Sequence, residues 1–125
     1  MNYLAHACLS FNHPEILTGN MISDFVKGKK KFDYSAQIQK GIALHRAIDE
    51  FTDAHEETRN AKLFFKPGYG LYAGAFVDIV YDHFLANDEN EFANDELASF
   101  SKKLIYNCRR MKILFRKNFI RHSII

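Results

Sequence analysis

Apolar residues recur at helical spacing along most of this chain, and the period-two alternation typical of β-strands is almost absent. The pattern is clearest between residues 36 and 54, where the apolar positions include Ile38, Ile42, Ile48 and Phe51. Ser35 comes directly before this stretch, and a serine hydroxyl is a good acceptor for the free N–H groups at the start of a helix. The sequence therefore predicts a helix over residues 36–54 that Ser35 caps.

Similar patterns predict the other helices. They span residues 2–11, 14 to about 28, about 56–65, 71–87, and a last stretch with Asn94 as its cap. Pro14 fits the first turn of its helix, and Lys66-Pro67-Gly68 is expected to end the helix that precedes it. KGKKK, at residues 27–31, is expected to be a basic loop. The prediction is an all-α fold.

The composition suits one domain with a substantial core. The chain has 125 residues, of which 47% are hydrophobic, and it includes 12 Phe and 6 Tyr. No stretch approaches the roughly 20 apolar residues of a membrane span, and the N-terminus lacks a signal-peptide pattern. Cys8 and Cys108 suggest neither a disulfide framework nor a metal knuckle. We therefore expect a cytoplasmic protein with no membrane partner.

The net charge of +2 hides an uneven distribution. Residues 1–101 contain 9 Lys or Arg and 15 Asp or Glu, whereas residues 102–125 contain 8 Lys or Arg and no acid. A basic end of this kind can bind nucleic acid or an anionic membrane. Alternatively, it is sequence that did not evolve with the rest of the domain.

Two of the predicted helices carry acidic or imidazole side chains at helical spacing. Residues four apart lie on the same side of a helix, so His45 lies beside Asp49, and Asp49 beside Asp53. Asp78 and Asp82 repeat this spacing inside GAFVDIVYDHF, one of the most apolar stretches of the chain. Carboxylates in an apolar helix are costly to bury unless a cation compensates their charge. Together the two pairs indicate a divalent metal site.

The types of ligand limit which metal ion can bind and which reaction that ion can assist. Mixed sets of imidazole and carboxylate suit Mn²⁺, Fe or Zn²⁺ better than Ca²⁺. Such an ion activates water and neutralises phosphate oxygens, which favours hydrolysis of a phosphate ester. The alternative is that His45 and Asp49 form a solvated surface pair, and that Asp53 and His55 only cap or solvate a helix end.

Four segments, in this order, resemble the acyl-carrier-protein phosphodiesterase family: MNYLAHACLS at the start, GNMISDFVKG at 19–28, GIALHRAIDEFTD at 41–53 and VDIVYDHFL at 77–85. The resemblance covers about residues 1–107. It implies an all-helical domain related to the HD-type metal-dependent phosphohydrolases. It also implies hydrolysis of the phosphodiester that links 4′-phosphopantetheine to holo acyl carrier protein, with Mn²⁺ as the metal.

The resemblance further implies roles for particular residues. The metal ligands would be His6, Asp24, His45, Asp49, Asp78, Asp82 and His83, of which His6, Asp24 and His83 come from the resemblance alone. Asp24 would orient or deprotonate the attacking water, and Arg46 would bind a phosphate oxygen. An ordinary solvated arginine is the alternative for Arg46. Gly19 and Asn20 are interpreted as local geometry.

The implied substrate protein is acidic, so the lysines of the basic loop are expected to form its docking patch, unless the loop only aids solubility. These lysines are Lys27, Lys29, Lys30 and Lys31. The predicted domain is a C-terminally shortened HD-like domain over residues 1–107, followed by a basic tail over 108–125. With permitted codons, another reading frame of the tail resembles the family's continuation, so a frameshift product is one hypothesis and an authentic short homologue is the other.

The expected shortening has consequences for assembly and activity. Helices that normally support the domain would be missing, which would leave apolar surface exposed on the 71–87 segment. We therefore expect a homodimer or a loosely packed monomer, with activity far below that of a full-length relative.

Two other functions are also compatible with the sequence. One is an HD-like hydrolase of nucleotides or other phosphate esters. The other is a non-catalytic helical binding module whose basic tail contacts nucleic acid. Nucleic acid is not the expected partner, because the body of the chain has no helix-turn-helix and no interleaving of aromatic and basic residues.

Overall fold

The computed structural model describes residues 2–110, and every regular element within them is helical, so the predicted all-α fold is confirmed. The α-helices are α1 (Tyr3–Cys8), α2 (Pro14–Ile22), α3 (Ala36–Ala54), α4 (Glu56–Tyr69), α5 (Ala73–Ala86) and α6 (Glu96–Arg110). Three short 3₁₀ helices connect them: η1 (Ser23–Phe25), η2 (Gly28–Asp33) and η3 (Gly70–Tyr72). Most of the predicted basic tail lies outside the described residues.

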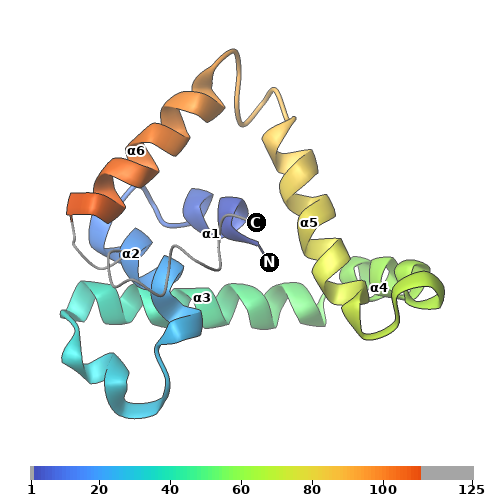
Figure 1. The fold of residues 1–125 in the computed structure, drawn as a ribbon, viewed down its shortest axis with the longest axis horizontal. Helices are drawn as coiled ribbons and strands as arrows, with labels where there is room; N and C mark the ends of the chain where they lie inside the picture. Colours follow the sequence, from blue (N-terminus) through green and yellow to red (C-terminus); the bar gives the residue numbers. More distant parts are fainter. Residues whose placement is uncertain (1, 111–125) are drawn as a thin grey trace.

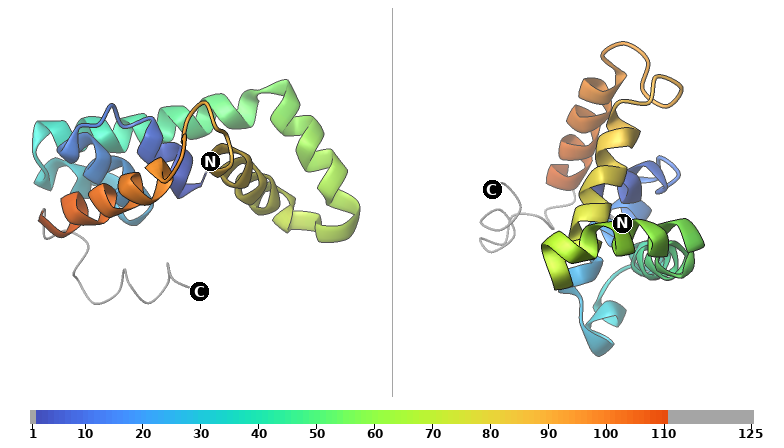
Figure 2. Two further views of the ribbon diagram at one scale, coloured as in Figure 1. Left: turned by 90° about the horizontal axis from the view of Figure 1, so that it is seen from above. Right: turned by 90° about the vertical axis from the view of Figure 1, so that its right-hand side faces the viewer.

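Helix α3 runs along the long axis of the molecule (Figure 1). Helices α2 and α6 lie toward one end of it, α4 and α5 lie at the other end, and α1 lies between them (Figures 1 and 2). The bounds of α3 are those that the sequence predicts, and the hydroxyl of Ser35 accepts a hydrogen bond from the backbone N–H of Ile38 at 3.4 Å. No helix in residues 2–110 is long and apolar enough to cross a lipid bilayer.

Several predicted boundaries are wrong for local reasons. Helix α4 continues through Pro67 to Tyr69 and ends only where Gly70 adopts a φ of 53°. Proline's fixed φ is compatible with a helix, although proline lacks an N–H donor and its ring crowds the carbonyl of the residue four positions earlier. Glycine tolerates the positive φ that terminates the helix.

The predicted second helix is also shorter than expected. Helix α2 ends at Ile22, and the basic segment that was predicted as a loop lies mostly in η2. Asn94 does not occupy an extended N-cap conformation, because its φ is 43°. Instead, the carboxylate of Glu96 accepts a hydrogen bond from the N–H of Ala93 at 3.1 Å.

A pair of glycines allows α2 and α3 to touch. A Cβ atom on Gly19 would collide with the carbonyl group of Ile38, and one on Gly41 would collide with the carbonyl oxygen of Ile16. Because neither residue has a side chain, the two backbones approach closely. This contact brings α2 against the first half of α3, one helical turn before His45 of the candidate site.

The buried core lies mainly around α2. One cluster consists of Ile22, Val26, Ile38 and Ile42, with Tyr34 packed against it. A second cluster joins α1, α2 and α6 through Ala7, Leu17 and Met21, against which Phe100 and Leu104 pack. These clusters pack both α1 and α3 against α2, which fixes the elements that carry the site.

Helices α4 and α5 pair with each other through aromatic side chains. The ring of Tyr69 stacks on that of Phe76 with 3.8 Å between centroids, and the hydroxyl groups of Thr58 and Tyr81 lie 3.0 Å apart. This pair still leaves several large apolar side chains in solvent, among them Phe64, Leu71 and Phe84. The predicted exposure of apolar surface on the 71–87 segment is therefore observed.

Candidate metal centre

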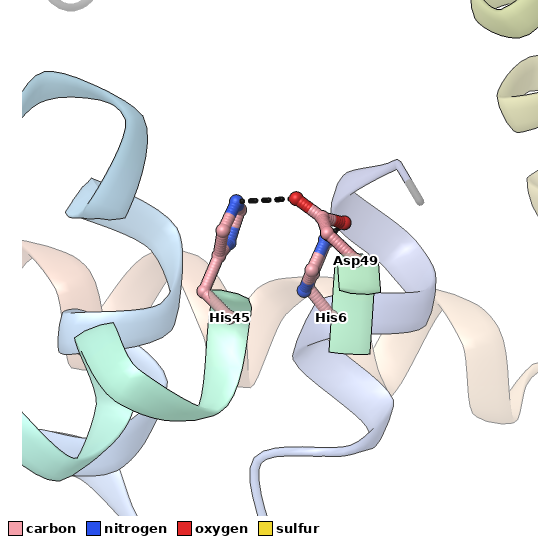
Figure 3. Close-up of side chains that lie close together, drawn as sticks. All are labelled: His6, His45 and Asp49. Atoms are coloured by element: carbon pink, nitrogen blue, oxygen red, sulfur yellow. Dashed lines mark hydrogen bonds and ion pairs between the residues drawn. The ribbon is translucent and has the colours of Figure 1, made fainter. Parts of the chain in front are cut away.

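Two histidines and an aspartate, which come from two helices, meet in one cluster (Figure 3). His45 and Asp49 lie one turn apart on α3, and His6 comes from α1. The Nε2 atom of His6 lies 3.1 Å from Oδ1 of Asp49, and Nε2 of His45 lies 3.3 Å from Oδ2 of the same carboxylate. One possible ligand atom from each residue lies within 4.8 Å of the other two.

The three side chains differ in exposure. His6 and His45 are buried, whereas the side chain of Asp49 is 36% exposed. The imidazole rings stack with 4.0 Å between their centroids and 9° between their planes. The cluster is therefore fixed on the protein side by two packed rings and reaches solvent through its carboxylate.

Asp24 joins the cluster from η1. Its Oδ1 atom lies 3.2 Å from Nε2 of His45, and its side chain is 63% exposed. His45 thus faces two carboxylates, one from its own helix and one from the segment after α2. The structure places His6 and Asp24 beside His45 and Asp49, as the family resemblance suggested.

The other ring nitrogen of His45 contacts Asn20, which is fully buried. Oδ1 of Asn20 lies 3.1 Å from Nδ1 of His45. The amide nitrogen of Asn20 donates to the carbonyl oxygen of His6 and to Oγ of Ser10, each at 3.0 Å. One amide therefore joins the two histidine-bearing helices.

The electrostatic surroundings favour the protonation states of metal ligands. Burial lowers the pKa of His6, and the adjacent His45 lowers it further. Burial raises the pKa of Asp49, but neighbouring groups, among them His45 and His6, lower it by more. A neutral imidazole and an ionised carboxylate are the forms that bind metal ions.

The acidic residues of α5 have different surroundings from those predicted. Burial raises the pKa of Asp78, and the negative charges of Asp49 and Asp53 also raise it. Asp82 instead accepts hydrogen bonds from the backbone N–H groups of Leu4 and Ala5 at 3.0 and 3.1 Å. Its carboxylate caps the start of α1, where free N–H groups favour an anion.

His83 is not part of the cluster either. It is exposed, and its ring lies against that of Phe84 with 5.8 Å between centroids. The expectation that Asp82 and His83 converge with the other ligands is therefore not met, because Asp82 faces the backbone of α1 and His83 faces solvent.

Asp53 forms an ion pair, and His55 has the capping role that the sequence analysis gave as an alternative. Oδ1 of Asp53 lies 2.7 Å from Nζ of Lys62. Nδ1 of His55 accepts a hydrogen bond from the N–H of Glu57 at 3.3 Å and so caps α4.

Arg46 lies on the neighbouring surface of α3. Its Nη2 donates to the carbonyl oxygen of Val26 at 3.4 Å. Arg46 also lines an open hollow of about 340 Å³, together with Lys31, Lys40 and Phe32. The guanidinium thus belongs to a basic hollow next to the segment that carries Asp24.

Comparison with known proteins establishes the family. The family described as acyl carrier protein phosphodiesterase matches residues 1–122. The chain belongs to this family. A relative named acyl carrier protein phosphodiesterase, from Klebsiella pneumoniae, is 38% identical over 95 residues, which cover 76% of this chain and 49% of the relative.

Other members of the acyl carrier protein phosphodiesterase family give the same picture. Relatives of that name from Photorhabdus laumondii and Yersinia enterocolitica are 40% and 35% identical, over 69% and 76% of this chain. The matches cover 43% and 49% of those relatives, so the chain spans about half the length of the curated relatives it matches. No solved structure matches the chain.

The residues that meet in this family member fit a divalent transition-metal ion. Two imidazoles and a carboxylate are a ligand set that suits Mn²⁺, Fe or Zn²⁺. Nε2 of His45 faces two carboxylate oxygens, which is the arrangement that a cation between them would stabilise. Within residues 2–110, the buried Nδ1 of His6 has no hydrogen-bond partner, so this ring makes its polar contact only at Nε2, toward Asp49.

Asn20 is the site residue that the sequence analysis misjudged. It was interpreted as local geometry, yet it contacts His45 directly and holds the end of α1. The signal was present in ILTGNMI, where one amide interrupts an apolar helix. A buried polar side chain needs hydrogen-bond partners, as do the carboxylates of Asp78 and Asp82.

Proposed function

We propose that this protein hydrolyses the phosphodiester that joins 4′-phosphopantetheine to holo acyl carrier protein, which leaves the apo form. The observation that carries the proposal is the meeting of His6, His45 and Asp49, with Asp24 beside them, in a member of the acyl carrier protein phosphodiesterase family. We propose Mn²⁺ as the ion and an HD-like relationship for the domain. When bound, such an ion lowers the pKa of a water molecule and neutralises phosphate oxygens.

We assign a role to each of the four side chains according to its burial. His6 and His45 are buried and held by packing, so they supply nitrogen ligands in fixed positions. Asp49 supplies a carboxylate whose two oxygens each face one of these imidazoles. Asp24 is the most exposed of the four, and we assign it the transfer of a proton from the attacking water, because its carboxylate reaches solvent beside His45.

A basic surface next to this cluster suits an acidic substrate protein. Lys27, Lys29 and Lys30 are exposed in and just before η2. Lys31, Lys40 and Arg46 line the adjoining hollow. We propose that acyl carrier protein docks on this surface. Arg46, which lines the hollow, then binds the carrier protein. Opposite charges increase the rate of encounter and fix the orientation of docking.

The assay measures conversion of holo to apo acyl carrier protein by mass spectrometry, in the presence of Mn²⁺. We expect the mass of the phosphopantetheine group to be lost, and Asp49→Asn to abolish the conversion. Glu50→Gln is the matched control, because Glu50 is an exposed neighbour on the same helix. No conversion with Mn²⁺, Fe²⁺ or Zn²⁺, or cleavage of nucleotides instead, would contradict the proposed substrate.

Charge reversal tests the docking surface. We expect Lys30→Glu to raise KM for holo acyl carrier protein while kcat stays nearly constant, with a larger effect at low salt. Lys102→Glu, at an exposed lysine of α6, is the matched control. Equal KM values for the two variants would place the docking surface elsewhere.

We also propose that the exposed apolar side chains of α4 and α5 mediate a homodimer. These helices lie beside each other and away from α2 and α6 (Figure 2), and Phe64, Leu71 and Phe84 project into solvent. Sedimentation velocity at several concentrations should show reversible association that Phe84→Glu weakens. Monomers at all concentrations would exclude the dimer.

A cytoplasmic location is the last part of the proposal. Cys8 and Cys108 are both free thiols, which is the usual state of cysteines in a reducing compartment. A fluorescent fusion observed in cells would test the location, and export to an oxidising compartment would contradict it.

A further inference from the structure

Asn20 occupies a position from which it can control His45. Its side chain is fully buried in α2, and the contact between Gly19 and Gly41 presses this part of α2 against α3. The Asn20 amide makes three polar contacts: to His45, to the carbonyl of His6 and to the hydroxyl of Ser10. Nothing in this arrangement lets the amide rotate without breaking buried hydrogen bonds.

The direction of the amide follows from its partners. The carbonyl oxygen of His6 can only accept a hydrogen bond, so it must face the amide nitrogen of Asn20. Ser10 donates its own hydroxyl proton to that same carbonyl at 2.7 Å, so the hydroxyl oxygen is also an acceptor toward Asn20. Both N–H groups of the amide are thereby used, and its oxygen is left to face Nδ1 of His45.

An oxygen that faces Nδ1 requires a proton on that nitrogen. The neutral ring of His45 then carries its lone pair on Nε2, which lies 3.2 Å from Oδ1 of Asp24 and 3.3 Å from Oδ2 of Asp49. The opposite tautomer would set two lone pairs against each other in a fully buried place, whereas the lone pair on Nε2 points toward carboxylates that reach solvent. The hydrogen bond at one ring nitrogen thus sets what the other can bind.

We propose that Asn20 is a positioning residue that holds His45 in the Nδ1-protonated form, so that Nε2 is free to bind a divalent cation. The inference rests on the metal site of the proposed function. The same amide also donates to the carbonyl of His6 and so links the end of α1 to this ring. This link holds the two stacked imidazoles in place relative to each other.

Mn²⁺ affinity, measured by electron paramagnetic resonance of the free ion, tests the inference without reference to activity. We expect Asn20→Leu to weaken binding by about 10- to 100-fold. The matched control is Ser10→Ala, which removes one buried partner of Asn20 but leaves its contact with His45, and we expect its affinity to remain within about threefold of the unaltered chain, well below that loss. Equal affinities for the unaltered chain and Asn20→Leu would overturn the proposal.

A second measurement needs no variant and no metal. Nitrogen-15 spectra of the unaltered chain at pH 9, with chelator present, identify which nitrogen of His45 carries the proton. A proton on Nδ1 supports the inference, and a proton on Nε2 overturns it, whether or not Asn20→Leu folds. If the unaltered chain binds no Mn²⁺, the metal site fails, and the spectra still test the role of Asn20 separately.

Discussion

The imidazole rings of His6 and His45, which come from different helices, lie stacked with 4.0 Å between their centroids and 9° between their planes. The stack covers one face of each ring, and the Nε2 atoms of both rings lie within 3.3 Å of the carboxylate of Asp49. It is energetically unfavourable for both stacked rings to be positively charged imidazolium ions, since like charges in a buried place repel each other. The arrangement therefore favours a neutral ring at His6, which is the more buried of the two.

This relationship predicts a pH dependence of stability. Burial and the adjacent His45 lower the pKa of His6 below 6.5, so the unfolded chain binds a proton at a higher pH than the folded chain does. The free energy of unfolding should therefore fall as the pH drops below about 6.5. Urea denaturation with chelator present, at pH values between 7.5 and 5.5, measures the slope. His6→Gln should make the slope shallower, and an unchanged slope would assign the pH dependence to other groups.

Asp49 should be indispensable for a stabilising response to metal, because its two oxygens each face one imidazole. If Mn²⁺ binds the folded chain alone, a concentration 100 times the Kd raises the free energy of unfolding by about 2.7 kcal/mol. Thermal melts with Mn²⁺ and with chelator measure this difference. We expect Asp49→Asn to abolish it and Glu50→Gln to retain it. The same response in both variants would place the ion elsewhere.

Asp82 should act through the stability of α1. Its carboxylate accepts the N–H groups of Leu4 and Ala5, so Asp82→Ala should reduce the free energy of unfolding by about 0.5–2 kcal/mol. Because the loss comes from a helix cap, it should be similar with chelator and with saturating Mn²⁺. If the variant loses stability only when Mn²⁺ is present, Asp82 is a ligand after all.

The close approach of α2 and α3 predicts opposite effects for two similar substitutions. Gly41→Ala places a methyl group against the carbonyl of Ile16 and should cost about 1–3 kcal/mol of stability. A Cβ on Gly74, in α5, would meet only Lys62 Cε, at an ordinary 3.6 Å. Gly74→Ala should therefore be neutral or stabilising, by up to about 1 kcal/mol. Denaturant midpoints measure both changes, and equal effects would contradict the glycine contact.

The sequence by itself determined the features that depend on local periodicity. Helix α3 has its predicted bounds and its Ser35 cap, because apolar spacing and capping act within a few residues. The pairing of His45 with Asp49 follows in the same way, since residues four apart share one side of a helix. The local sequence also gave a wrong prediction at Pro67, which was expected to end its helix, because the last turn of α4 tolerates a missing N–H donor.

Only the tertiary structure decided which distant groups meet. An acidic residue in an apolar helix indicates a buried partner, but the pattern cannot say whether that partner is a cation or a backbone N–H group, and for Asp82 it is the start of α1. Asn20 gave the same kind of signal, and its role became visible once the glycine contact had brought α2 against α3. Hydrogen bonds between helices depend on how the helices pack, and packing depends on contacts between residues that lie far apart in the chain.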